Sequence, residues 1–335
     1  MKYIGVDAHS SSCRFSVFDE KGVEVDNLAI ETNGRLLVKY VKSIEGRKKL
    51  TYEESELSYW LYEILHKEVD NLLICNPVKN RSYKKAKTDK LDARQLAKLL
   101  RGGFLSPVYH NGSEREQFRK LMSAYEDIIR MGVSVKNRHK SLFRRTGIFV
   151  DGERIYGDKS FLEGLKGKEE KFIGQQNYKI LLQLEEIRKA YVKEIIKYGK
   201  KFKEIKKLKS IPGLGDIQAA KIVSQVIEPG RFRNKYKYYS YCGLVRHPRE
   251  SGGKKYGSTR ADGNHILKCV YKMAGHTVLR GKSQLRIYYE HLRQAGRGHK
   301  SAYNAVCRKL AAISLSIWRH NKEYKNEMIS IDHLK

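Results

Sequence analysis

The sequence predicts an α/β domain followed by two regions rich in helix. Short apolar strands and amphipathic helices alternate over residues 1–108. Charged residues at helical spacing dominate residues 109–206, and a turn rich in proline and glycine opens residues 207–335. We therefore expect an N-terminal α/β domain, a linker of long coiled-coil-like helices and an all-α C-terminal domain.

The N-terminal part contains three strands, a helix, a strand, a helix, a strand and a further helix. Apolar runs or alternation identify the strands, and apolar residues three and four apart identify the helices. We expect the strands near residues 3–6, 14–18, 23–30, 50–52 and 72–75, and the helices near 33–44 and 57–69 and from 89 onwards. This order is typical of a ribonuclease H-like domain, in which carboxylates at strand ends and on a late helix converge on metal.

Four carboxylates occupy such positions. Asp7 ends the first strand and Glu53 ends the fourth. Asp89 and Asp92 open the last helix on one face, since residues three apart on a helix are neighbours. Oxygen ligands favour Mg²⁺ or Mn²⁺, and two such ions about 4 Å apart support phosphodiester chemistry. The alternative is that Thr88 or Asp89 caps the helix and that acids in its first turn complement its dipole.

The chain is strongly basic. It has 68 Lys and Arg against 37 Asp and Glu, a formal net charge of +31, and nucleic acid is the usual partner of such a chain. A basic run that includes Lys84, Lys85 and Lys87 leads into the two helical aspartates. No apolar run approaches the roughly 20 residues of a membrane span, and the five scattered cysteines are typical of reduced, cytoplasmic proteins. We expect a cytoplasmic, nucleoid-associated protein that does not bind membranes.

The middle region predicts two long helices. The second carries apolar residues at steps of three and four from Leu181 to Ile205, including Phe202. These steps match a coiled-coil seam. We therefore expect this region to pair with itself or with a second subunit.

The last region opens with Pro212-Gly213-Leu214-Gly215, which resembles the turn of helix-hairpin-helix modules. In those modules, backbone amides of the turn hold a DNA phosphate at a helix N-terminus. In this chain the corresponding amides would be those of Gly213 and Gly215. Arg231 and Arg233 follow, interleaved with aromatic residues, and this mixture suits phosphate contact and base stacking. Helices are expected near residues 264–279, 283–295 and 300–320.

A second candidate centre is Ser251, which two glycines follow. Arg249, Lys254 and Lys255 are close in sequence, and a hydroxyl becomes a nucleophile when cations or a metal stabilise its alkoxide and the attacked phosphate. The alternative is an ordinary Ser-Gly-Gly turn on a basic surface loop. The rival hydroxyls are those of Tyr256, Ser258, Thr259 and Ser283.

Several motifs, taken in chain order, resemble the DEDD transposases of insertion sequences, some of which are guided by a bridge RNA. The motifs that carry the resemblance are Tyr3-Ile4-Gly5-Val6-Asp7, Lys87-Thr88-Asp89-x-x-Asp92, Ile211-Pro212-Gly213, Glu250-Ser251-Gly252 and Gly263-Asn264-His265. They extend over nearly the whole chain.

The resemblance implies a RuvC-like N-terminal domain with Asp7, Glu53, Asp89 and Asp92 as metal ligands. It also implies a C-terminal transposase domain in which Ser251 attacks a DNA phosphate and forms a phosphoserine link. Donor and target DNA, a bridge RNA and a homodimer or homotetramer are the implied partners. One departure is that Glu54 follows Glu53 where the family usually has a small residue and a glycine, so Glu54 remains an alternative ligand.

Two other functions fit the residues without the resemblance. One is a metal-only nuclease of resolvase or ribonuclease H type, in which water attacks the phosphate. The other is a nucleic-acid-binding protein without catalysis, in which the four carboxylates are caps and surface acids.

Overall fold

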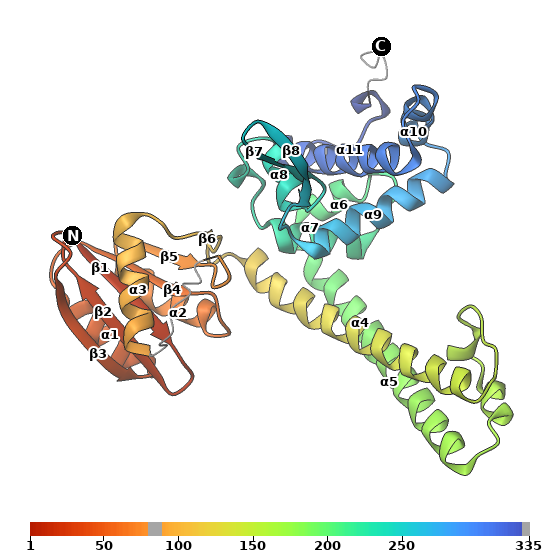
Figure 1. Ribbon diagram of the computed structural model, residues 1–335, viewed down its shortest axis with the longest axis horizontal. Helices are drawn as coiled ribbons and strands as arrows, with labels where there is room; N and C mark the ends of the chain where they lie inside the picture. Colours follow the sequence, from red (N-terminus) through yellow and green to blue (C-terminus); the bar gives the residue numbers. More distant parts are fainter. Residues whose placement is uncertain (80–88, 330–335) are drawn as a thin grey trace. The chain divides into compact units, whose positions relative to one another are not determined.

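The computed structural model describes residues 1–79 and 89–329, so Lys84, Lys85 and Lys87 lie outside the described residues. The chain divides into two compact units, residues 1–113 and residues 114–335 (Figure 1).

The first unit is built on a mixed six-stranded sheet with the strand order β3-β2-β1-β4-β5-β6. The strands are β1 (Lys2–Ala8), β2 (Ser12–Phe18), β3 (Glu24–Glu31), β4 (Lys48–Glu53), β5 (Asn71–Cys75) and β6 (Pro107–Val108). The first three form an antiparallel meander, while β4 and β5 run parallel to β1. This mixed α/β arrangement is compatible with the predicted ribonuclease H-like fold. The short strand β6 was not predicted.

Helices cover both faces of this sheet (Figure 1). They are α1 (Gly34–Ser43), α2 (Ser58–Leu65) and α3 (Asp89–Gly102). Apolar side chains of α1 and α2 share a buried core with Val6 and Tyr52, whereas α3 packs on the opposite face with Cys75. The prediction extended α2 to residue 69, but residues 66–70 form a turn, where the Asp70 carboxylate accepts a hydrogen bond from the Lys48 amide at 2.7 Å.

Gly5 lets α3 lie directly on β1. A Cβ atom at this position would lie 2.2 Å from the carbonyl oxygen of Ala93 and 2.4 Å from the amide nitrogen of Ala97. No side chain fits in that space. The close approach brings the first turn of α3 to the carboxyl end of β1.

The second unit begins with two long helices, α4 (Glu114–Arg145) and α5 (Lys168–Gly199), which pack against each other (Figure 1). The middle region therefore pairs with itself within one chain, as one of the two predicted alternatives had it. The predicted seam was too long, however. Helix α5 ends at Gly199, and Phe202 and Ile205 belong to the turn and short helix α6 (Lys203–Leu208) that follow, where they join the C-terminal core.

The remaining helices of this unit share one large core, to which α4 and α5 also contribute. The remaining helices are α7 (Asp216–Val226), α8 (Lys235–Tyr241), α9 (His265–Arg280), α10 (Gln284–Gln294) and α11 (His299–His320). The C-terminal region is not all-α as predicted, because β7 (Arg246–Ser251) and β8 (Lys254–Arg260) form an antiparallel hairpin. Among the described residues, no helix is long and apolar enough to cross a membrane.

Candidate active site

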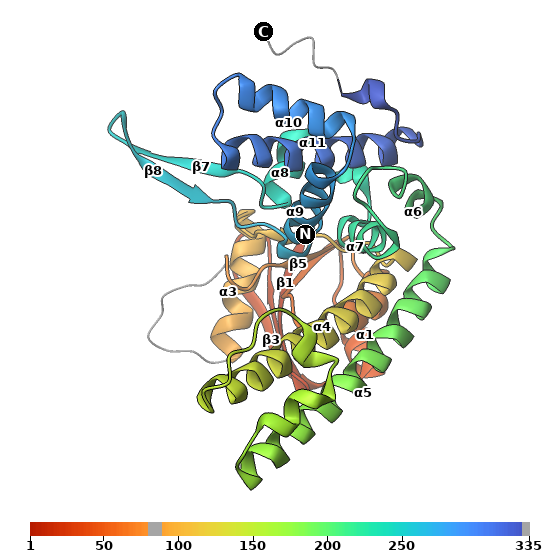
Figure 2. The same cartoon turned by 90° about the vertical axis from the view of Figure 1, so that its right-hand side faces the viewer.

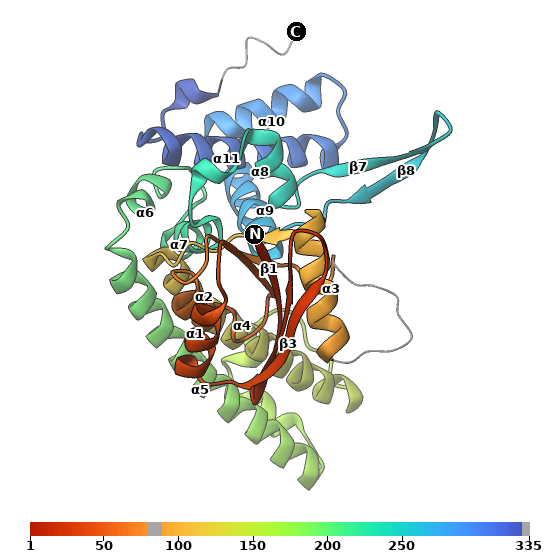
Figure 3. The ribbon, with the colours of Figure 1, turned by 90° about the vertical axis from the view of Figure 1, so that its left-hand side faces the viewer.

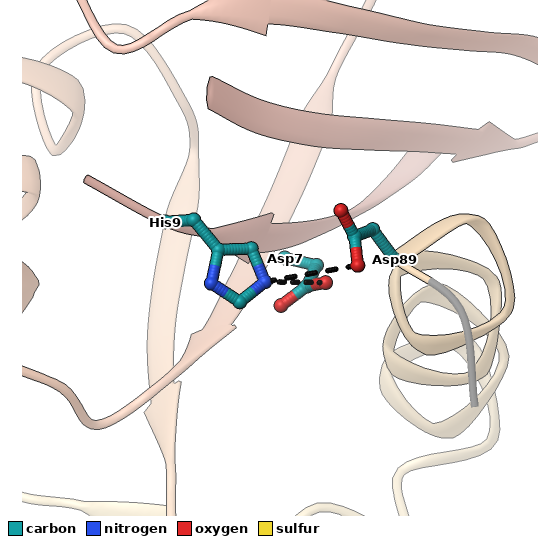
Figure 4. Close-up of side chains that lie close together, drawn as sticks. All are labelled: Asp7, His9 and Asp89. Carbon is teal, nitrogen blue, oxygen red and sulfur yellow. Dashed lines mark hydrogen bonds and ion pairs between the residues drawn. The ribbon is translucent and has the colours of Figure 1, made fainter. Parts of the chain in front are cut away.

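Side chains from β1 and α3 meet at the end of the sheet (Figure 4). Nε2 of His9 lies 3.2 Å from Oδ2 of Asp7 and 3.9 Å from Oδ1 of Asp89. One ligand atom from each of these three residues lies within 4.8 Å of the other two. The fold therefore brings together two carboxylates that are 82 residues apart in the sequence (89 − 7).

An ion pair between α3 and β3 helps to hold the helix in this place. Nε of Arg94 in α3 donates to Oε1 of Glu24 in β3 at 2.9 Å, and the hydroxyl of Ser16 in β2 donates to the same oxygen at 2.8 Å. The bond from Arg94 is the main reason why the pKa of Glu24 falls to about 2. Gly5 and this ion pair together position the first turn of α3.

The electrostatics of Asp7 reflect its crowded surroundings. Burial raises the pKa of this carboxyl group, the charge and hydrogen bond of His9 oppose that change, and the nearby carboxylates of Asp89 and Asp92 raise the pKa further. Several acids gathered at one place repel each other, and a divalent cation among them removes that repulsion. Carboxylate oxygens suit Mg²⁺ or Mn²⁺, and the imidazole suits transition metals. The two carboxylates thus fit the predicted metal, whereas the imidazole of His9 was not part of the predicted oxygen ligand set.

Glu53 and Asp92 lie near this cluster but outside it. Strands β1 and β4 are parallel neighbours with Val6 opposite Tyr52, so Asp7 and Glu53 are the next residues on adjacent strands. Asp92 is close enough to Asp7 to affect its pKa. Within the described part of the chain, neither Glu53 nor Asp92 belongs to the tight group of ligand atoms.

The alternative ligand Glu54 has another environment. Its carboxylate lies 3.5 Å from Nε2 of His110, and its amide donates to the carbonyl oxygen of Cys75 at 2.9 Å. Because successive residues of a strand point to opposite faces, Glu53 shares the face of Asp7 more naturally than Glu54 does.

His9 was not among the predicted site residues. The prediction considered only carboxylate oxygens as ligands, so it did not include an imidazole. The available signal was the spacing Asp7-Ala8-His9, since residues two apart in an extended segment point to the same side.

Ser251 is the last residue of β7 and is exposed. Gly252 (φ 54°) and Gly253 (φ 74°) form a tight two-residue turn between two paired strands. Both angles are positive, a conformation that favours glycine. Ser251 therefore has a defined position opposite Lys254.

The rival hydroxyls differ in their surroundings. The Ser258 hydroxyl accepts a hydrogen bond from Nε of Arg246 at 2.8 Å. The Ser283 hydroxyl caps α10 by accepting from the amide of Arg286 at 3.3 Å. Thr259 is partly buried, and Tyr256 is exposed. Two of the four rivals thus have structural partners of their own.

The predicted phosphate-binding turn does lie between two helices, α6 and α7. Its glycines also have packing roles, because a Cβ at Gly213 (φ 84°) would lie 2.6 Å from the carbonyl oxygen of Ala274 in α9. Gly215 is the N-cap residue of α7.

The predicted basic residues divide into packed and exposed ones. The Arg231 guanidinium lies 4.8 Å from the ring centre of Phe232 and 4.5 Å from that of Tyr241, which is a packing role. Arg233, Arg249, Lys254 and Lys255 are exposed, and of these Lys255 lies 3.6 Å from a carboxylate oxygen of Glu250.

Comparisons with known proteins match two separate segments of the chain. A family model described as "Transposase" matches residues 4–148, and one described as "Transposase IS116/IS110/IS902 family" matches residues 205–290. A curated protein of Sinorhizobium fredii (strain NBRC 101917 / NGR234), named "Putative transposase y4qE", is 22% identical over 300 residues, which cover 81% of this chain and 75% of that protein. The first matched segment contains the four carboxylates, and the second contains Ser251.

Proposed function

This chain belongs to the IS116/IS110/IS902 family of transposases, enzymes that recombine DNA, and from that premise we propose that it works through two centres. The first is a metal centre at the end of β1, and the second is the hydroxyl of Ser251. The observation that carries the proposal is the convergence of Asp7, His9 and Asp89 at one sheet end of a transposase.

In the first centre, Asp7, Glu53, Asp89 and Asp92 hold Mg²⁺ or Mn²⁺. Such an ion, when bound, stabilises the negative charge that develops on a phosphate and on its leaving oxygen. His9 orients Asp7 through their hydrogen bond. The mixed sheet with a late helix across it supports the view that this part is a RuvC-like domain.

In the second centre, the oxygen of Ser251 attacks a DNA phosphate. A bond forms between Oγ and phosphorus while the bond from phosphorus to a deoxyribose oxygen breaks, so one phosphodiester replaces another. A later attack by a DNA hydroxyl on the phosphoserine link rejoins the strand without ATP. The exposed position of Ser251 at a hairpin end supports this role.

The wider proposal includes the division of the chain into residues 1–108, 109–206 and 207–335, with catalysis in the outer parts. It also includes a homodimer or homotetramer, donor and target DNA, and a bridge RNA encoded by the element. The net charge of +31 supports a polyanionic partner.

The test is a search for a covalent protein–DNA adduct. Full-length protein is incubated with donor and target DNA, the noncoding RNA that flanks its reading frame, and Mg²⁺. We expect an adduct with the wild type and with Ser258→Ala, and none with Ser251→Ala. An adduct of undiminished yield in Ser251→Ala overturns the nucleophile assignment.

The second candidate function is a metal-only nuclease. The observation in its favour is that Asp7, His9 and Asp89 meet within residues 1–113 alone. This function predicts hydrolysed ends, no adduct, full activity in Ser251→Ala and loss of activity in Asp89→Asn. The same experiment therefore separates the two.

A further inference from the structure

The β7–β8 hairpin projects from the helices of its own unit as a two-stranded ribbon (Figure 2, Figure 3). Every residue of β7 is exposed, and so are residues 252–258. Isolated two-stranded ribbons are marginally stable in water. The exposed side chains of the ribbon are mostly polar and do not belong to a hydrophobic core. They are therefore available for a ligand.

The register of the ribbon decides which side chains accompany Ser251. Lys254 lies directly opposite Ser251 and Lys255 opposite Glu250, and the register then shifts by one residue, so that Gly257 lies opposite Arg249. The extra residue is Tyr256 in β8, so β7 runs from Arg249 to Ser251 without an insertion. Opposite residues, and residues two apart on one strand, point to the same face. Ser251, Lys254 and Arg249 therefore share one face. Since a Cβ at Gly257 would have no neighbouring atom within 4 Å, open space remains across from Arg249.

Lys255 belongs to the other face. It pairs with Glu250 in the register, and its Nζ lies 3.6 Å from Oε1 of Glu250. This pair leaves the Lys255 charge partly neutralised and directed away from Ser251. Two adjacent lysines thus have different surroundings, which the sequence alone does not distinguish.

The turn favours this register of the two strands. Gly252 and Gly253 both have positive φ angles, 54° and 74°, as in a type I′ turn, whose twist matches that of paired strands. The turn is closed by Ser251 and Lys254, and directly opposite Cβ atoms are about 5 Å apart. Two glycines at the tip also let a DNA backbone approach closely.

We propose that Lys254 and Arg249 bind the phosphate that Ser251 attacks, whereas Lys255 does not. This inference rests on the proposed function of Ser251. As the bond from Oγ to phosphorus forms, negative charge grows on the non-bridging oxygens, and the two cations donate hydrogen bonds to them. The serine proton passes to solvent and the departing deoxyribose oxygen takes one from solvent, so the exchange is balanced.

The first experiment compares Lys254→Gln with the matched control Lys255→Gln. The rate of adduct formation is measured at saturating DNA, and DNA affinity is measured separately. We expect Lys254→Gln and Arg249→Gln each to lower the rate by roughly 10²-fold, and Lys255→Gln to change it by less than about threefold, since it loses a peripheral charge only. Lys254→Arg is expected to restore part of the rate. Equal loss in Lys254→Gln and Lys255→Gln overturns the proposal.

The second experiment replaces the scissile phosphate with a methylphosphonate, which carries no charge. A cation that stabilises the charge of this phosphate contributes little when the phosphate is neutral. The difference in the rate of adduct formation between wild type and Lys254→Gln is therefore expected to shrink to within about threefold. A purely structural role for Lys254 leaves the difference unchanged and contradicts the proposal. If wild type forms no adduct on ordinary DNA, the proposed function itself fails, and this inference fails with it.

Discussion

At the residue scale, the carboxyl group of Asp7 is in surroundings that disfavour its charged form. Burial and the carboxylates of Asp89 and Asp92 raise its pKa, so the folded chain binds the proton more tightly than the unfolded chain does. The free energy of unfolding therefore falls as the pH rises above the ordinary value of 3.8. A divalent cation reverses this penalty because it favours the charged carboxylate.

Replacing the charge of Asp7 tests this balance. Asp7→Asn is expected to raise the melting temperature of the metal-free protein at pH 7 and to abolish Mg²⁺-dependent adduct formation. Melting is measured in EDTA and again with Mg²⁺, which is expected to stabilise wild type only.

The matched control is Asp70→Asn. The pKa of Asp70 is lowered, chiefly by the hydrogen bond from the Lys48 amide, so removal of its charge is expected to lower the melting temperature. A metal-free Asp7→Asn protein that melts below wild type contradicts the explanation.

At the element scale, the position of α3 decides whether the site exists. The helix brings Asp89 to Asp7 because it lies close against β1 at Gly5, and the ion pair of Arg94 with Glu24 ties it to β3. Because the pKa of Glu24 is about 2, its carboxylate remains charged until the pH approaches that value. This contact between helix and sheet is therefore stable across the physiological range.

Gly5→Ala is expected to move α3 away from the sheet, because the new methyl group meets backbone atoms of Ala93 and Ala97. Overpacking of this kind costs about 1–3 kcal/mol. Denaturant unfolding measures this loss, and the Mg²⁺ concentration needed for half-maximal adduct formation is expected to rise with it.

Gly132→Ala in α4 is the control, because a Cβ there has no neighbouring atom within 4 Å. This change removes a glycine from a helix interior and is expected to stabilise the protein by about 0.5–1 kcal/mol. Destabilisation by Gly5→Ala without any change in the Mg²⁺ requirement separates the helix position from the metal site and contradicts our account.

At the scale of the whole molecule, charge dominates. A chain with a net charge of +31 repels itself until a polyanion binds. Each lysine or arginine that contacts a phosphate releases counterions from the nucleic acid, so affinity depends on salt. This holds for RNA and for DNA of any sequence.

We therefore expect the affinity for non-specific duplex DNA to fall by about 10³-fold or more between 50 mM and 200 mM salt, as for proteins with six or more phosphate contacts. Fluorescence anisotropy at several salt concentrations measures the slope. Arg249→Gln is expected to reduce the slope of log affinity against log salt by about 1, which corresponds to the loss of one phosphate contact. A slope near zero contradicts the assignment of a nucleic-acid partner.

The local sequence pattern was sufficient to predict much of the secondary structure of this protein. The order of strands and helices in the N-terminal part follows from apolar spacing, and so does the placement of Asp7, Glu53, Asp89 and Asp92 at the ends of elements. Neighbouring side chains determine such features, so they can be read along the chain. The C-terminal hairpin was missed, because its strands are polar throughout and carry no apolar alternation.

Only the tertiary structure decided which of these residues meet. Contact between Asp7 and Asp89, and the addition of His9, depends on how closely α3 approaches β1, which is set by long-range packing at Gly5. The different roles inferred for Lys254 and Lys255 depend on strand register. Spacing along the chain specifies the elements, but their relative register and distance result from contacts between distant residues, so only the folded chain defines the site.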